Sequence, residues 1–189
     1  MKHIKSFKIF ESLTTENQIS IEQFLNEIKI PLSRVQQITE WWGQNRDIKI
    51  YYFPFRSAKP IAGVFLGTDS IAINSSLPMP PHVKLFLALH ESRHCDQHAQ
   101  GIFMEGYYDT VVNGDKDSFL QSYRELEKDA NDFAINSMRA IGFEREMDME
   151  EMRLRGNEGA GNMVYQMMTN DINRLNPTDF IDLLKKQIL

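Results

Sequence analysis

Three short apolar runs near the middle of the chain have the pattern of β-strands. Residues 48–53 are rich in β-branched and aromatic side chains, and residues 70–74 alternate between polar and apolar positions. Residues 61–66 form the remaining run, which the turn-forming sequence Gly67-Thr-Asp69 closes. Because the connections between the runs are short, we predict that these strands form a small antiparallel meander.

The apolar residues before these runs recur at helical spacing. A short helix is predicted after Ser20, a residue type that caps helix N-termini, and it ends before Pro31. A second helix follows Ser33. Two short helices also occur in DNA-binding helix-turn-helix motifs, but few basic residues are available here to contact phosphate, so we interpret both as packing helices. Their apolar positions are Ile21, Phe24, Leu25 and Ile28 in the first, and Val35, Ile38, Trp41 and Trp42 in the second.

Two longer helices are predicted after the strands, over about 82–100 and about 117–141. The first is apolar almost all round in its first half, which is typical of a buried helix. The second is amphipathic, and its apolar residues fall within one arc of about 140°. Glu127 lies inside that arc, where a carboxylate is costly unless a positive group meets it. The other members of the arc are Phe119, Leu120, Tyr123, Leu126, Ala130, Phe133, Ala134, Met138 and Ile141.

The composition is typical of one compact domain. The chain has 189 residues, of which 42% are hydrophobic and 25% charged, and its formal net charge of -5 argues against a nucleic-acid-binding surface. No run approaches the roughly 18 apolar residues of a membrane span, and one cysteine is typical of a reducing compartment. We therefore predict a soluble, cytoplasmic protein that binds neither nucleic acid nor membranes. Its expected parts are a flexible tail over 1–17, one domain over 18–142 and a helical extension over 143–189 that packs on the same domain.

The sequence His90-Glu-Ser-Arg-His94, within the helix over about 82–100, is an H-E-x-x-H motif. Its spacing places the two imidazoles one helical turn apart and about 40° around the axis, so both can reach one metal ion. Glu91 is rotated by about 100° from His90 and can lie beside that ion. Single buried histidines are more often core residues, but this pair with its carboxylate favours a metal site. Zinc is the natural ion, because water on zinc loses a proton near neutral pH.

A catalytic zinc needs a third protein ligand. The metzincin pattern would require Gly and His where this chain has Gln97 and Gln100. His98 is on the same helix, and because three successive turns of one helix cannot surround a tetrahedral ion, we interpret it as a supporting or surface residue. Glu127 is favoured, because zinc would compensate its charge within the apolar arc. The alternative is a carboxylate at the edge of the arc that reaches water.

Polar residues near these ligands are candidates for an outer hydrogen-bonding layer. Asp129 and Asn131 flank the apolar arc close to Glu127, and Gln97 follows His94 by three residues. Side chains in such positions can orient metal ligands. We therefore predict that Asp129, Asn131 and Gln97 support the site without binding the ion.

Two residues beside the second histidine face away from the metal stripe. Arg93 is expected to pair with a carboxylate, either Asp96 or Asp129. Cys95 is rotated by about 100° from His94, which predicts a small buried residue and not a metal ligand.

Three segments of the chain resemble the ImmA/IrrE-type zinc metallopeptidases. They are residues 70–74 (S-I-A-I-N), 86–94 (F-L-A-L-H-E-S-R-H) and 127–134 (E-K-D-A-N-D-F-A). That family shows a strand ending in I-x-I-N, a helix with A-H-E-x-x-H and a helix with E-x-E-A-N-x-F-A. The resemblance covers about residues 60–142 and implies a zincin-like, gluzincin-type fold. By position it implies His90, His94 and Glu127 as zinc ligands and Glu91 as general base.

The chain departs from the family pattern at two places. Ser92-Arg93 stands where Leu-Gly is usual, and the aliphatic-Pro ending after residue 134 is absent. The sequence from His94 to Gln97 is instead similar to small phage-encoded relatives that read H-E-x-R-H-x-x-Q. Family members cleave transcriptional repressors, and the departures bear on the substrate more than on the chemistry.

Together, these features predict an α+β, zincin-like fold. A small antiparallel sheet would pack on the H-E-x-x-H helix and the third-ligand helix, with extra helices at both ends. The predicted function is a zinc endopeptidase with one ion per chain that hydrolyses a specific protein or peptide, and Tyr107, Tyr108 and Tyr123 are candidate oxyanion donors. The alternative is a non-catalytic zinc-bearing virion component or interaction module on a zincin scaffold. A structural zinc would prefer four protein ligands and needs no general base, which favours the enzyme.

The N-terminal segment suggests that the protein is packaged in a phage capsid. Residues 1–11 end in Ile9-Phe10-Glu11, which resembles the Leu/Ile-x-Glu cleavage sites of capsid-targeting leaders in some tailed phages. This resemblance implies packaging in a capsid and cleavage after Glu11. Intact-mass analysis of virion-derived protein would test it, because retained residues 1–11 would contradict the hypothesis.

Overall fold

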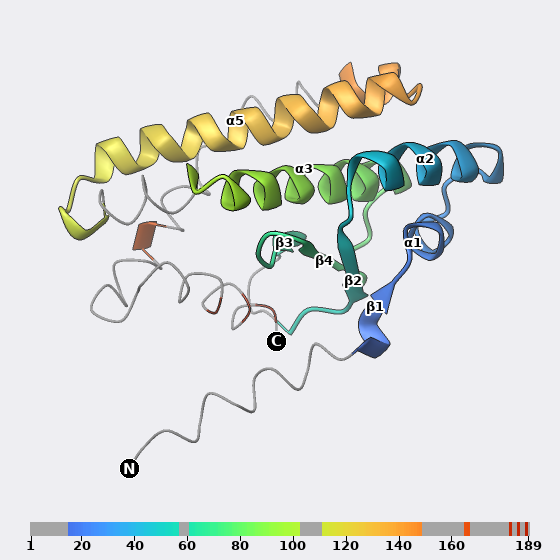
Figure 1. Cartoon of the computed structure of the whole chain (residues 1–189), viewed down its shortest axis with the longest axis horizontal. Helices are drawn as coiled ribbons and strands as arrows, with labels where there is room; N and C mark the ends of the chain where they lie inside the picture. The colour runs from blue at the N-terminus through green and yellow to red at the C-terminus, as the bar shows by residue number, and fades with distance from the viewer. Residues whose placement is uncertain are drawn as a thin grey trace, which may run out of the picture.

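The computed structural model describes residues 15–56, 61–102 and 111–148, together with residues 165, 166, 182, 185 and 188. Within these ranges the fold is α+β, and helix α3 lies between the sheet and helix α5 (Figure 1). The helical elements are η2 (Thr15–Asn17), α1 (Ile21–Glu27), α2 (Leu32–Asn45), α3 (Pro81–Ala99) and α5 (Lys116–Ala140). The strands are β1 (Gln18–Ile19), β2 (Lys49–Phe53), β3 (Gly63–Phe65) and β4 (Ser70–Asn74).

The sheet is mixed, so the predicted antiparallel meander is wrong. The strand order is β1-β2-β4-β3, in which β2 and β4 are parallel while β1 pairs with β2 and β3 with β4 in antiparallel fashion. The physical reason is the burial of β4, whose residues Ile71, Ala72 and Ile73 are all fully buried although successive side chains point to opposite faces. A meander would place this strand at an edge, whereas the observed order places it between two neighbours.

The two N-terminal helices are packing helices, as predicted, because α1 packs against both α2 and β2. Ser20 caps α1 in a capping box, because its Oγ accepts a hydrogen bond from the Gln23 backbone at 3.1 Å and the Gln23 side chain accepts one from the Ser20 backbone at 2.9 Å. Phe24 of α1 makes edge-on ring contacts with Trp42 of α2 and Tyr52 of β2. Strand β1 was not predicted, since two residues are too few to show a period.

The C-terminal end of α5 is linked to α2 by hydrogen bonds from a side chain of α2. The chain leaves α5 through Gly142, whose φ of 86° favours glycine. The Arg34 guanidinium donates hydrogen bonds to the carbonyl oxygens of Ile141 and Gly142 at 3.1 and 3.0 Å. This contact satisfies carbonyl groups that a helix C-terminus otherwise leaves without partners.

Parts of the predicted tail and C-terminal extension lie outside the described residues. Where the extension is described, Phe143 and Met147 are buried in the main core, and Ile188 packs with Val64 and Leu66 on the other hydrophobic cluster of the sheet. The domain boundaries stay a prediction, as does cleavage after Glu11. Among the described residues, no helix combines the length and apolar character needed to cross a membrane.

Candidate metal centre

Helices α3 and α5 bring His90, His94 and Glu127 together. The Nε2 atoms of the two histidines are 3.0 Å apart. The Glu127 carboxylate reaches both, with Oε2 at 3.4 Å from His90 Nε2 and Oε1 at 3.4 Å from His94 Nε2. These residues form the one group of three or more His, Cys, Asp or Glu side chains in the described part of the chain that could hold a metal ion.

The spacing of these donor atoms suits zinc. Two ligands that each lie about 2.0–2.1 Å from a tetrahedral zinc are about 3.3 Å apart, which is close to the three observed separations. Two imidazole nitrogens and one carboxylate are also a donor set that zinc accepts. Both histidines are buried, whereas the Glu127 side chain is 31% exposed, so solvent can approach from the Glu127 side. The residues present therefore fit a zinc ion with one position left for water.

The charges of the triad support each other. Burial alone would lower the pKa of His94, but the hydrogen bond to Glu127 and the charge of that carboxylate raise it to about 9. Burial likewise opposes ionisation of Glu127, yet its hydrogen bonds to His90 and His94 hold its pKa well below the usual range. The centre thus contains an ionised carboxylate that draws a positive charge to this point between the helices.

Glu91 lies beside the triad and is enclosed by strand β3. Burial raises the pKa of its carboxyl group, which the charges of His90 and His94 oppose. A backbone hydrogen bond from Phe65 also favours its ionised form. A Cβ added at Gly63 would lie 3.2 Å from Glu91 Cγ and 3.3 Å from Glu91 Oε1, closer than nearly all real contacts of this kind. Strand β3 therefore holds the carboxylate in place, and glycine leaves room for it.

The contribution of Gly63 was missed in the sequence. The available signal was an isolated glycine within a strand-like run, which often marks a close approach of another group to the backbone. That signal does not say which group approaches. The partner, Glu91, is 28 residues away along the chain, and only the packing of α3 on β3 brings the two together.

Two of the three predicted supporting residues, Gln97 and Asp129, are linked to His94 by hydrogen bonds, Gln97 directly and Asp129 through Gln97. Gln97 Oε1 lies 2.7 Å from His94 Nδ1, and Gln97 Nε2 donates to Asp129 Oδ2 at 2.8 Å. Asn131 is half-buried on α5, and within the described residues it has no hydrogen bond to the triad. The predicted pairing of Arg93 is confirmed, because it contacts both Asp129 and Asp96.

The remaining candidates are not members of the triad or lie outside the described residues. Tyr107 and Tyr108 fall outside the described ranges. Tyr123 is half-buried one turn before Glu127, with its ring stacked on Phe119 at 6.3 Å between centroids, so its role as an oxyanion donor stays a prediction. His98 is not part of the triad, and burial lowers its pKa.

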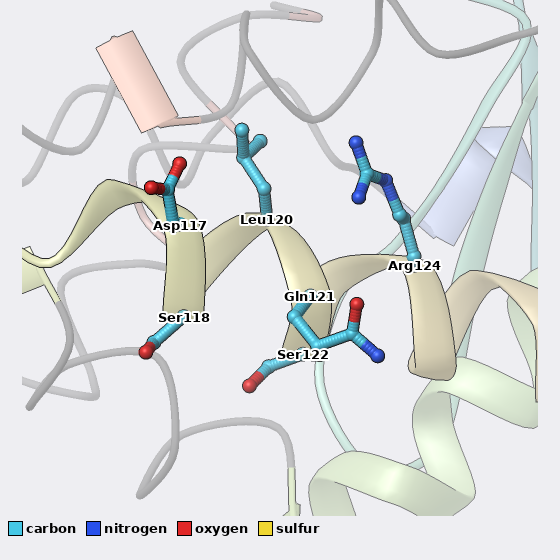
Figure 2. Close-up of a pocket in the computed structure, with 6 residues that line it drawn as sticks. All are labelled: Asp117, Ser118, Leu120, Gln121, Ser122 and Arg124. Atoms are coloured by element: carbon cyan, nitrogen blue, oxygen red, sulfur yellow. The ribbon is translucent and has the colours of Figure 1, made fainter.

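A separate hollow follows the first turns of α5 (Figure 2). It has a volume of about 560 Å³ and shares no lining residue with the triad. Its walls combine acidic, basic, hydroxyl and amide side chains, and one leucine. The lining residues are Asp117, Ser118, Leu120, Gln121, Ser122 and Arg124. This mixture of side chains defines no single ligand class.

Comparison of the chain with protein-family models, with curated protein sequences and with solved structures finds no match. The class of site that the fold supports is therefore defined by its own geometry, a possible metal site of two histidines and one glutamate on two packed helices.

Proposed function

We propose that this protein is a zinc-dependent peptidase of the gluzincin-like, ImmA/IrrE type. The observation that carries the proposal is the convergence of His90, His94 and Glu127 at zinc-like spacing, with the buried carboxylate of Glu91 beside them. The resemblance of residues 70–74, 86–94 and 127–134 to that family supports the same assignment. We further propose that the substrate is a specific protein, cleaved at an internal peptide bond.

In this proposal each residue has a distinct task. A zinc ion held by His90, His94 and Glu127 would supply a Lewis acid that polarises the scissile carbonyl and acidifies water. Glu91 accepts a proton from the attacking water and delivers it to the leaving amine nitrogen. Its raised pKa, caused by burial, suits the first step, because a stronger base accepts the proton more readily.

The enclosure of Glu91 favours catalysis over a purely structural zinc. A structural site needs a fourth protein ligand more than it needs an adjacent carboxylate. Burying a carboxylate is costly even where a backbone hydrogen bond and nearby histidines stabilise it, so the position of Glu91 next to the metal ligands is best explained by a role in the reaction. If the protein cleaves no substrate, the non-catalytic zinc-bearing module becomes the favoured function.

The test compares zinc-loaded wild type with Glu91→Gln on peptides from a bacterial proteome. New peptide ends, read by mass spectrometry, should appear with the wild type and not with the variant. Both proteins should contain about one zinc per chain, because Glu91 is not among the ligands. Absence of cleavage by the fully loaded wild type, on both peptides and intact proteins of the lysate, would contradict the peptidase and favour the non-catalytic module.

A further inference from the structure

The side-chain amide of Gln97 has only one orientation that satisfies its neighbours. Its Nε2 atom lies 3.1 Å from the carbonyl oxygen of Leu126 and 2.8 Å from Asp129 Oδ2, and both partners only accept hydrogen bonds. The amide nitrogen must therefore face α5. Oε1 is left facing the imidazole of His94, whose Nδ1 atom is 2.7 Å away. The positions of the amide oxygen and nitrogen are thus assigned from the hydrogen-bond partners, because the two ends of an amide group have nearly the same shape.

This orientation determines which nitrogen of His94 carries a proton. Because Gln97 Oε1 only accepts, His94 Nδ1 must donate, whether or not Nε2 is also protonated. His94 Nε2 then points toward His90 Nε2 and Glu127 Oε1, at 3.0 and 3.4 Å. The ring is thus held with the correct nitrogen toward the centre before any ion arrives.

Arg93 holds the far end of this chain of contacts. Its Nε and Nη2 atoms donate to the two oxygens of Asp129 at 2.8 and 3.2 Å, a two-point contact that fixes a carboxylate in direction as well as position. Asp129 needs this support, since its side chain is 47% exposed. Arg93 also packs over the ring of Phe133 and contacts Asp96.

His90 lacks comparable support. Its Nδ1 atom is buried and has no hydrogen-bond partner among the described residues. The two histidines are therefore held differently, because the outer nitrogen of His94 has a hydrogen-bond partner while that of His90 has none among the described residues. Removing the hydrogen bond of Gln97 should therefore disturb the orientation of His94 more than that of His90.

We infer that Arg93, Asp129 and Gln97 form a positioning chain that presets His94 for metal binding and thereby strengthens the affinity of the centre for zinc. This inference rests on the proposed function, because it assumes that the triad binds zinc. It assigns a role to Arg93, whose guanidinium acts on His94 only through Asp129 and Gln97. None of the three residues is a metal ligand.

The test measures zinc affinity of the full chain by competition with a chromogenic chelator. Gln97→Leu should weaken binding by about 10- to 100-fold, the range found when an outer hydrogen-bond partner of a metal ligand is lost. Its matched control is Gln100→Leu, the same change at an exposed position at the end of the same helix. Asp129→Asn and Arg93→Met should weaken binding by smaller factors, with Asp132→Asn as the exposed control on α5.

A second measurement separates positioning from a merely structural effect. In long-range ¹H–¹⁵N NMR spectra of the zinc-loaded wild type, His94 should show a protected Nδ1–H proton. This signal should be lost in Gln97→Leu, whereas the His90 signals should change less. If Gln97→Leu does not fold, Asp129→Asn provides the same comparison at a half-exposed site.

The outcomes distinguish this inference from the proposed function. Wild-type protein that takes up no zinc would overturn the metal centre and the positioning chain with it. Wild type that binds zinc with the same affinity as Gln97→Leu would overturn the positioning chain alone. A loss of affinity with an unchanged His94 Nδ1–H signal would also overturn it, since the effect would then not pass through the imidazole.

Discussion

Helices α3 and α5 supply the candidate centre together, but their surroundings differ. Helix α3 contacts β3 and β4 on one side and α5 on the other, and ten of its nineteen residues are buried. Helix α5 has seven buried residues in twenty-five, because only one of its faces packs against the protein. The enclosed helix carries His90, Glu91 and His94, while the amphipathic helix contributes Glu127 from the edge of its packed face.

The comparison shows why the same residue type has different meaning on the two helices. A buried polar side chain on α3 cannot reach water, so it needs a partner inside the protein. His94 and Gln97 of α3 have such partners, and the cost of burying them indicates a built site. On α5 a polar residue can turn to solvent, so Glu127 is informative only because it turns inward.

The largest expected effect is that of removing the inward-facing carboxylate of α5. Glu127→Ala should abolish stoichiometric zinc binding, a greater loss than the about 10- to 100-fold cost of removing an outer hydrogen-bond partner. Elemental mass spectrometry of the purified protein measures this directly. Glu125→Ala, an exposed change two residues away on the same helix, should leave zinc content as in the wild type. Equal zinc content in both variants would mean that Glu127 is not a ligand.

The next effect concerns the apolar side chains that the two helices pack against the rest of the protein. Leu85→Ala on α3 should lower the free energy of unfolding by about 2–5 kcal/mol, because the leucine is fully buried and its removal leaves a cavity. Leu120→Ala on the half-buried edge of α5 should cost less than about 1.5 kcal/mol. Urea unfolding followed by circular dichroism gives both values. A reversed order would show that α3 is not the more enclosed helix.

A smaller effect tests the close contact between β3 and α3. Gly63→Ala should destabilise the fold by about 1–3 kcal/mol, because the new methyl group would press on the Glu91 side chain. In a Glu91→Ala background the same change should cost less, since the close contacts with Glu91 Cγ and Oε1 are removed while that with Ile73 Cδ1, at 3.1 Å, remains. Chemical denaturation of the four proteins in this cycle provides the coupling. An equal cost of Gly63→Ala in both backgrounds would place the strain elsewhere, for example on Ile73.

The smallest effect concerns the side of α3 that faces the sheet. Burial raises the pKa of the Cys95 thiol to about 12, and its Sγ atom donates a weak hydrogen bond to the Ser70 carbonyl oxygen at 3.3 Å. The folded protein should therefore resist iodoacetamide at pH 8, because almost no thiolate is present and the sulfur is covered. Intact mass should show one adduct per chain only after unfolding in urea. Rapid labelling of folded protein would indicate that α3 separates readily from β4.

Much of the local structure was predictable because it depends on short-range pattern. Ser20 and Gln23 are three residues apart, so the start of α1 could be predicted from a capping signal. The two long helices were predicted within one or two residues of their observed ends, since their apolar and polar positions repeat over many turns. The order of the strands was wrong, because short runs with similar composition do not encode which neighbour each will pair with.

The sequence by itself determined the spacing of His90 and His94, the adjacent Glu91 and the inward position of Glu127, because helical periodicity links residue number to direction. Only the tertiary structure decided that Glu127 meets the histidines, since residues more than 30 positions apart are joined by the packing of α5 on α3 and not by any local rule. The same holds for Gly63 against Glu91 and for the contacts between Gln97 and Asp129. Local geometry is set by the backbone, whereas a site with donors from two helices depends on the burial that brings those helices together.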